Sequence, residues 1–203
     1  MTQFYILRHA QTDFNVEHRL QGQFDAPLNT KGLQQAQQLA EKFPVDDFVA
    51  FYGSDLCRCQ QTAQPLAKKL NLRYQPQADL REKHFGILQQ YTHPQAAKKY
   101  PDIYQSFQQG DLFYRPPQGE SQADFVARFI PCLQTLATKH PDDKVLIMTH
   151  GGVLASLLQH TLQLPSGGKR HFLLTNLSVN IFNYQPNSGW QLQLFGWDIC
   201  HAV

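Results

Sequence analysis

The sequence predicts an α/β fold: a three-layer sandwich with a mainly parallel central sheet, helices on both faces, and a small helical cap insertion around 91–117. Short apolar runs, typical of buried strands, alternate along the chain with longer segments of helical periodicity. This is the order expected of parallel strands joined by crossover helices. The 203 residues are 42% hydrophobic, which is enough for one core, and we find no repeat or linker. We therefore expect a single domain over residues 1–203.

The first strand is predicted at residues 4–8, where aromatic and β-branched side chains end in Arg8. A helix follows the segment PLNTKG, with Thr30 as its N-cap and Pro44 at its end. Its inner face is expected to contain Leu33, Ala36, Ala40 and Phe43.

The second strand is predicted at residues 48–53, FVAFYG, and Ser54 or Asp55 is expected to cap the helix after it. That helix contains Pro65, which we expect to kink it. Its inner face is predicted to hold Leu56, Ala63, Leu66 and Leu70. A short extended piece is expected near residues 72–75.

The second half begins with the insertion at 91–117, which is rich in Tyr, Phe, Gln and Pro and only weakly periodic, so short helices are expected there. Ser121 and Asp124 form a capping pair that opens a helix running to about His140. KVLIMTH at 144–150 predicts a buried strand, and GGVLASLLQHTL predicts the helix after it. Last, LSVNIFNY and WQLQLFGW alternate around QPNSG, which predicts a hairpin or two neighbouring strands.

The composition excludes several classes of function. The net charge is only +2 and the basic residues are dispersed, so we expect no nucleic-acid partner. The four cysteines (Cys57, Cys59, Cys132 and Cys200) do not have zinc-site spacing and are expected to be reduced thiols. The N-terminus has neither the basic lead of a targeting segment nor an apolar run long enough to span a membrane. We expect a cytoplasmic protein without a membrane partner.

Basic side chains follow three of the predicted strands at the point where each strand ends. One strand runs into Arg8 and His9, another into His150, Gly151 and Gly152, and Arg58 lies in the first turn of the helix after FVAFYG. In open α/β sheets, ligands bind beyond the carboxyl ends of the strands. Two guanidinium groups and two imidazoles at these ends, with glycines that let the backbone approach a ligand, predict a phosphate site.

These motifs resemble those of the histidine phosphatase superfamily, in its phosphoglycerate mutase-like branch. The resemblance runs in family order through LRHAQTDFNVEHRLQGQFDAPLNTKGLQQAQQLA, FYGSDLCRCQQTAQPLA, LREKHFG, PPQGES and VLIMTHGGVLASLL. It covers nearly the whole chain and implies the same α/β sandwich.

The resemblance also implies specific roles. His9 is the nucleophile that forms a phosphohistidine, and Arg8, Arg58 and His150 hold the phosphoryl oxygens. Glu82 protonates the leaving oxygen and then helps to activate water. The remaining binding residues are Asn15 at the phosphoryl group, Gln21 and Gly22 at the rim of the substrate site, and Gly151. Because the arginines disfavour a charged imidazole and stabilise the transferred phosphoryl group, no metal and no cofactor are expected.

The function expected from this resemblance is metal-independent hydrolysis of a small phosphorylated metabolite. A phosphoglycerate mutase-type transfer stays open, although the insertion is shorter than in true mutases. A non-catalytic module that binds a phospholigand also stays open. Its only support is FGILQQ at 85–90, where the family often has Phe-Gly-x-Trp-Glu-Gly. The identity of the substrate is open as well, and so is the choice between monomer and homodimer.

Overall fold

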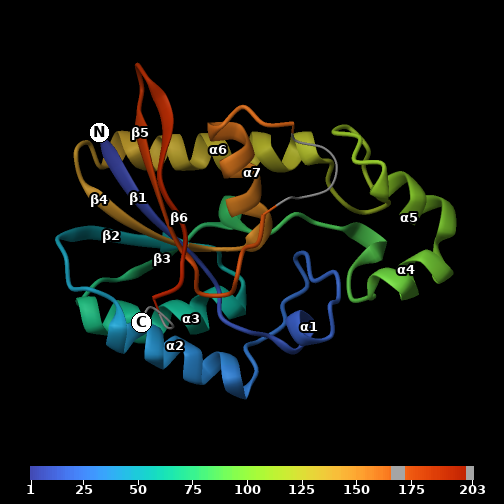
Figure 1. The fold of residues 1–203 in the computed structure, drawn as a ribbon, viewed down its shortest axis with the longest axis horizontal. Coiled ribbons are helices and arrows are strands. Elements are labelled where there is room, and N and C mark those ends of the chain that lie inside the picture. The colour runs from blue at the N-terminus through green and yellow to red at the C-terminus, as the bar shows by residue number, and fades with distance from the viewer. Residues whose placement is uncertain (166–171, 200–203) are drawn as a thin grey trace.

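A six-stranded sheet with the order β3-β2-β4-β1-β5-β6 forms the centre of the computed structural model, which describes residues 1–165 and 172–199 (Figure 1). Its strands are β1 (Thr2–Arg8), β2 (Phe48–Gly53), β3 (Tyr74–Pro76), β4 (Lys144–Thr149), β5 (Val179–Gln185) and β6 (Gly189–Trp197). Strands β3, β2, β4 and β1 pair in parallel, whereas β5 is antiparallel to β1 and β6 is antiparallel to β5. The mainly parallel sheet and the C-terminal hairpin are both confirmed.

Helices cover both faces of this sheet, as the sequence predicts. The helices of the described residues are α1 (Asp13–Val16), α2 (Thr30–Lys42), α3 (Cys57–Leu70), α4 (His93–Lys99), α5 (Pro101–Gln108), α6 (Gln122–Lys139) and α7 (Gly151–Thr161), of which α4 and α5 lie beside the sandwich. Two short 3₁₀ turns lie at Ala78–Leu80 and Gly86–Leu88. Helices α6 and α7 lie on one face, and α2 and α3 lie on the other (Figure 1). No helix within the described ranges is both long and apolar enough to cross a membrane.

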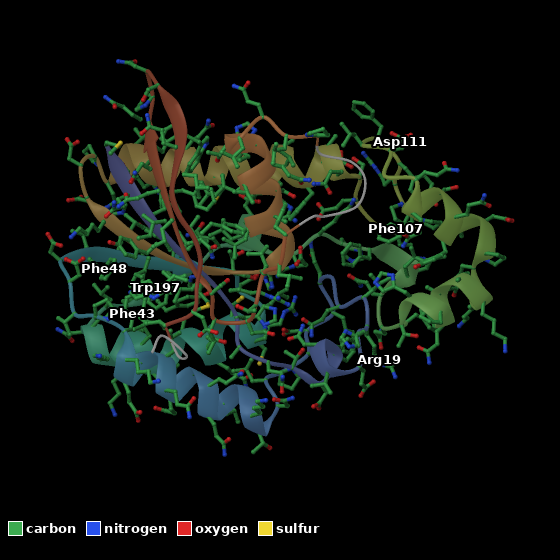
Figure 2. The ribbon with its side chains drawn as sticks, in the orientation of Figure 1. Arg19, Phe43, Phe48, Phe107, Asp111 and Trp197 are labelled. Carbon is green, nitrogen blue, oxygen red and sulfur yellow. The ribbon has the colours of Figure 1, made fainter. Side chains whose placement is uncertain are left out.

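The two faces have separate cores because side chains alternate along each strand. In β4, Val145 and Ile147 pack with α6 and α7, whereas Leu146 and Met148 pack with α2 and α3. A strand that is buried on both faces needs an unbroken apolar run, which explains the sequence VLIM. Figure 2 shows Phe43, Phe48 and Trp197 together on the side of α2 and α3, where the rings of Phe43 and Phe48 are 5.8 Å apart.

The start and the inner face of α2 differ from the prediction. Asn29, not Thr30, is the N-cap, and its side chain accepts a hydrogen bond of 2.8 Å from Gly32 N. A Cβ at Gly32 would overlap the carbonyl oxygen of Gln11, so the first turn packs directly against that backbone. This contact turns Leu33 outward, where it is 48% exposed. The buried residues of the helix are Gly32, Ala36, Leu39 and Ala40.

Helix α3 is not capped by Ser54 or Asp55, because both are used elsewhere. The Ser54 hydroxyl accepts from Leu56 N, and the Asp55 carboxylate binds Arg81 at 2.5 and 2.6 Å. Leu56 is the N-cap and provides no side-chain bond, while Cys57 N donates to Asp25 Oδ1 at 2.7 Å. A residue 32 positions away therefore replaces the expected local cap.

The inner face of α3 is also more polar than expected. Pro65 lies inside the helix, as predicted. Leu66 and Ala63 are buried, but Leu70 is only partly so. Arg58, Cys59 and Thr62 share the buried face. Their burial places a guanidinium, a thiol and a hydroxyl close to the ends of β1 and β4.

The insertion forms a small cap beside the sandwich (Figure 1). Helices α4 and α5 confirm the expected short helices, and the cap has its own core, separate from the other two. Leu20, Leu88 and Ala96 are buried in this core. The predicted capping box of Ser121 and Asp124 opens α6, and the short strand expected near 72–75 is β3.

Candidate active site

The register of the sheet brings the two histidine motifs together. Arg8 in β1 pairs with Thr149 in β4, and His9 N donates to Thr149 O at 3.0 Å. The ring centroids of His9 and His150 are consequently 5.3 Å apart. Segments separated by about 140 positions in the chain thus meet at the edge that sequence reasoning predicts.

The orientation of the His9 imidazole is set by its own neighbour. Its Nδ1 lies 2.7 Å from the carbonyl oxygen of Ala10, which can only accept, so Nδ1 carries the proton. The other ring nitrogen, Nε2, is therefore the one with a free lone pair. His9 is only 3% exposed, which limits the approach of water to that lone pair. This is the arrangement that a nucleophilic imidazole requires.

Both histidines are held in the neutral form. Burial, and then the charges of Arg58 and Arg8, hold the pKa of His9 well below its usual range. Burial is also the largest cause for His150, whose pKa is likewise well below its usual range, followed by Arg58 and His9. Cys59 Sγ lies 3.5 Å from His150 Nε2, and burial raises the pKa of this thiol to about 12, so it adds no negative charge.

These shifts predict that the free energy of unfolding falls in mild acid. The folded-state pKa of each histidine is below the unfolded value, so the unfolded chain binds more protons once the pH drops below about 6.5. Stability is then lost by up to about 1.4 kcal/mol per pH unit for each histidine. Denaturant titrations from pH 8 to pH 5 measure this slope.

Two variants test the source of this slope. His150→Ala is expected to reduce it by about half, because one of two buried imidazoles is removed. His160→Ala is the control, because His160 is exposed at the end of α7. A slope that is the same in His150→Ala and in wild type would contradict the assignment.

Arg58 is fully buried and organises the loop that precedes α2. It donates to Gly22 O at 2.7 Å and to Phe24 O at 2.9 Å. Its Nε is buried and makes no hydrogen bond to the residues that the structure describes. Removing a guanidinium from water is costly, and an oxyanion would compensate that cost. Arg58 thus combines a structural role in the loop with donors that are left for a ligand.

Arg8 lies at the other side of the site. Its Nη1 donates to the carbonyl oxygen of Leu174. A Cβ at Gly151 would lie 3.4 Å from Arg8 Nε, so the start of α7 passes close to the guanidinium. The free N–H groups of a helix N-terminus and a guanidinium favour an anion at the same place.

Glu82 is bound at the start of α7. Its carboxylate accepts from Gly152 N at 2.8 Å and from Lys83 N at 2.9 Å. A Cβ at Gly152 would overlap this carboxylate, so only glycine leaves room for it. The side chain of Glu82 is therefore placed beside Gly151, at the same end of the helix as Arg8.

A partly buried ion pair supports the segment that carries Glu82. Arg128 in α6 binds Glu120 at 2.8 Å, and it also donates to the carbonyl oxygens of Asp79 and Arg81 at 2.7 and 3.2 Å. Glu120 in turn accepts from His84 N at 2.8 Å. The PPQGES turn thus contributes to the site by fixing the backbone on both sides of Glu82.

The predicted rim residues form one hydrogen-bonded group. Asn15 Oδ1 accepts from the backbone N and the hydroxyl of Thr12, both at 3.1 Å. Gln21 Nε2 donates to the same hydroxyl at 2.6 Å. Gly22 has a φ of +54°, and a Cβ there would overlap Gln89 Oε1. Gln21 therefore contacts the site through Thr12, whereas Gly22 contacts Arg58.

The unusual stretch at 85–90 is integrated into this architecture. Gln89 Oε1 accepts from Gln23 N at 2.7 Å, and Leu88 is fully buried in the core of the cap. Gln90 has a φ of +73°, a conformation that favours glycine, which the family often has there. Leu88 and Gln89, where the family often has Trp and Glu, thus have a structural role. Gln90, where the family often has Gly, carries some backbone strain.

A cleft of about 530 Å³ opens between the sandwich and the cap. Arg8, Glu82 and Gly151 are among the residues that line it. Its remaining walls are largely aromatic and polar, and they include Lys83, Phe85, Phe107, Asp111, Tyr114, Gln122 and Phe172. Figure 2 shows Phe107 and Asp111 on the cap. His9, Arg58 and His150 are more deeply buried and do not line the open part of the cleft.

All the predicted site residues fall in this region, but the sequence did not reveal their supports. Thr12, Gln89 and Asn176 hold groups of the site in place, and none of them was assigned this supporting role from the sequence. Thr12 could have been found, because Thr-x-x-Asn before a short helix is a capping pattern. The described residues contain no group of three or more His, Cys, Asp or Glu side chains placed to hold a metal ion.

Comparison with known proteins supports the resemblance to histidine phosphatases over nearly the whole chain. The sequence profile of the histidine phosphatase superfamily (branch 1) matches residues 4–198. Phosphoglycerate mutase-like protein 4 of Arabidopsis thaliana is 35% identical, over 97% of this chain and 85% of that protein. Metal-independent phosphoserine phosphatase of the same plant is 37% identical, over 99% of this chain and 83% of that protein.

A solved structure agrees with the fold as well. YhfR of Bacillus stearothermophilus superposes with a TM-score of 0.90 at 28% identity, and the match covers 99% of this chain and all of that one (100%). The resemblance inferred from the motifs is therefore confirmed. With two strand ends that bring His9 and His150 together and a profile match from residue 4 to residue 198, the chain belongs to the histidine phosphatase superfamily.

Proposed function

We propose that this protein hydrolyses small phosphomonoesters through a phosphohistidine at His9, without a metal ion. The observation that carries the proposal is the His9 imidazole. Its Nδ1 is bound by Ala10 O, its pKa is held well below the usual range, and it lies against His150 at the end of β1. The relatives named as a mutase-like protein and as a metal-independent phosphoserine phosphatase are 35% and 37% identical to this chain, which supports a phosphoryl-transfer function.

In the first step, Nε2 of His9 attacks the phosphorus atom. The N–P bond forms as the bond from phosphorus to the leaving oxygen breaks, and Glu82 in its protonated form gives its proton to that oxygen. Arg8, Arg58, His150 and the N–H of Gly151 bind the phosphoryl oxygens, with Asn15 as a further donor. Their fixed positive charge and dipoles stabilise the negative charge of the transition state.

In the second step, a water molecule attacks the phosphohistidine. Glu82, now a carboxylate, accepts a proton from this water as the new O–P bond forms and the N–P bond breaks. Inorganic phosphate and neutral His9 result. Glu82 lines the cleft and is bound to Gly152 N and Lys83 N, a position that suits both proton transfers.

Hydrolysis is favoured over the mutase reaction by the small size of the cap. A mutase must keep water from its phosphorylated intermediate until the phosphoryl group has been transferred to the second hydroxyl of the substrate. Here the cap consists of two short helices, of 7 and 8 residues. The non-catalytic alternative loses its only support, because Leu88 and Gln89 at 85–90 are integrated into the cap and the loop at Gln23.

The cleft suggests which leaving groups fit. Phe85, Phe107 and Tyr114 from the cap region provide an apolar wall, and Lys83 and Gln122 provide polar contacts. A leaving group with one apolar face and one polar edge therefore matches this lining. We further propose that residues 1–203 act as one domain and that the protein is cytoplasmic, in line with the free thiols of Cys57, Cys59 and Cys132. Cys200 lies outside the described residues.

A phosphate-release assay tests the proposal. The purified protein is incubated with an aryl phosphate, with phosphoserine and with 3-phosphoglycerate, with and without a metal chelator. We expect phosphate release that the chelator does not reduce, and acid-labile phosphate trapped on the protein by rapid quenching. Interconversion of the two phosphoglycerates faster than phosphate release would favour the mutase instead.

The neighbouring glycines of α7 provide a matched pair of variants. Gly152→Ala places a Cβ against the Glu82 carboxylate, so we expect kcat to fall by roughly 10²-fold, a typical contribution of a general acid. Gly151→Ala keeps the backbone N–H and brings the Cβ only to 3.4 Å from Arg8 Nε, so a much smaller loss is expected. Steady-state kinetics of both variants provide the comparison. Equal losses would contradict the assigned position of Glu82.

A further inference from the structure

The side chain of Asn176 lies behind the nucleophile, on the segment between α7 and β5. Its Nδ2 is 2.7 Å from His9 O, 3.2 Å from Ala10 O and 3.4 Å from Asn15 Oδ1. All three oxygens belong to residues at or next to the phosphoryl site. An amide nitrogen has two hydrogens, so it can reach all three oxygens when one hydrogen is shared between two of them.

The carbonyl oxygen of Ala10 connects Asn176 with the chemistry of His9. The same oxygen accepts from Asn176 Nδ2 and lies 2.7 Å from His9 Nδ1. Its position decides which tautomer His9 adopts and where Nε2 points. A donor on the far side of Ala10 O limits the movement of this carbonyl, and therefore limits the movement of the ring.

The contact with Asn15 fixes a second group. Asn15 Oδ1 already accepts from Thr12 N and from the Thr12 hydroxyl, and Asn176 adds a third donor. With the oxygen of the Asn15 amide turned toward these donors, its NH₂ group is the part left to donate to a phosphoryl oxygen.

The backbone around Asn176 is bound to the strand that carries the nucleophile. Leu177 N donates to Arg8 O at 3.0 Å, Arg8 N donates to Ser178 O at 3.3 Å, and Leu174 O accepts from Arg8 Nη1. The backbone of segment 174–178 thus contacts both the backbone and the side chain of Arg8. Such an arrangement holds a reacting group more rigidly than a free loop would.

We infer that Asn176 is a positioning residue, which holds the His9 imidazole through Ala10 O and orients the Asn15 amide toward the phosphoryl group. The inference rests on the function proposed above. It assigns the residue no contact with the substrate: Asn176 acts through His9 and Asn15. Its loss should therefore change kcat and the pH dependence more than KM.

Two variants at this position and one control variant test the inference. Asn176→Ala is expected to lower kcat about tenfold, the equivalent of one neutral hydrogen bond, with a smaller change in KM. Asn176→Asp keeps the shape but places a carboxylate near His9, which favours the imidazolium. Since His9 must be neutral to attack, the acidic limb of the pH profile of kcat/KM is expected to move to higher pH.

Asn183→Ala is the matched control. Asn183 is a second asparagine, within β5, buried and bonded to Gln3 and Gln193 away from the site. We expect it to lower the melting temperature without moving the acidic limb. If Asn176→Asp does not fold, Asn176→Ser, which keeps one donor, takes its place, and a kcat between those of wild type and Asn176→Ala supports the inference.

Wild-type kcat and an unmoved acidic limb in the Asn176 variants would overturn the inference, and so would the same kinetic losses in Asn183→Ala. A kcat for Asn176→Ser no higher than that of Asn176→Ala would count against it as well. Failure of the proposed function would look different, because the wild-type protein itself would then release no phosphate from any phosphomonoester.

Discussion

Replacement of His9 by alanine is expected to lower kcat for phosphate release by on the order of 10⁴-fold or more, because the covalent route is lost. Within the described part of the site, His9 is a buried imidazole in which a backbone carbonyl binds one ring nitrogen, Nδ1, and leaves the other, Nε2, free to attack. Neither His150 nor Glu82 can replace it, because both are held by other contacts. Stopped assays with an aryl phosphate measure the rate, and quenched-flow trapping measures the phosphohistidine.

His160→Ala, at the exposed end of α7, is the control for this experiment and should retain wild-type turnover. The folded state of His9→Ala is checked by its melting temperature, since removal of a buried imidazole could change stability. Turnover that continues undiminished in His9→Ala, in a folded protein and with a chelator present, would refute the mechanism.

Replacement of Arg58 by alanine is expected to have the second-largest effect, with kcat/KM reduced about 10³-fold, as for arginines that stabilise a transferred phosphoryl group. The loss has two causes. A fully buried positive charge is removed from the phosphoryl site, and the carbonyl oxygens of Gly22 and Phe24 lose their donors. The second cause should also destabilise the protein, by about 1–3 kcal/mol for the buried carbonyl of Gly22 left without its donor.

Arg58→Lys separates the two causes. Lysine keeps the charge but cannot reach both carbonyl oxygens and a phosphoryl oxygen in the planar geometry of a guanidinium. We therefore expect kcat/KM between those of wild type and Arg58→Ala, together with a loss of stability. Arg73→Ala is a suitable control, because Arg73 is an exposed arginine. If Arg58→Ala unfolds at the same denaturant concentration as wild type, its proposed role in the loop is wrong.

The sequence predicted that Arg8, His9 and His150 meet because each of them stands in a short motif at the end of a strand. Arg8 and His9 follow one strand and His150 and Gly151 follow another, and parallel strands end at the same edge of a sheet. The apolar run of β4 likewise identified a buried strand. Local sequence patterns were sufficient to predict those features that neighbouring residues in the chain determine.

Other features were missed because their causes are distant in sequence. Asp25 binds the first turn of α3, and Gln11 approaches Gly32 so closely that Leu33 turns outward. The role of Asn176 depends on the antiparallel pairing of β5 with β1, which places residue 176 behind residue 9. The periodicity of the sequence does not predict contacts between residues that are distant in the chain.

The separate small core of the cap has a consequence for how the protein responds to denaturant. Strand β1, with His9 at its end, lies between β4 and β5 and is anchored by two large cores, whereas α4 and α5 rest on a cluster built around Leu20, Leu88 and Ala96. Regions with few buried apolar contacts open first, at a free energy below that of global unfolding. In hydrogen exchange, amides of the cap should therefore exchange well before those of β1. At low urea concentrations, discrimination among leaving groups should decline before the ability to cleave an activated ester is lost.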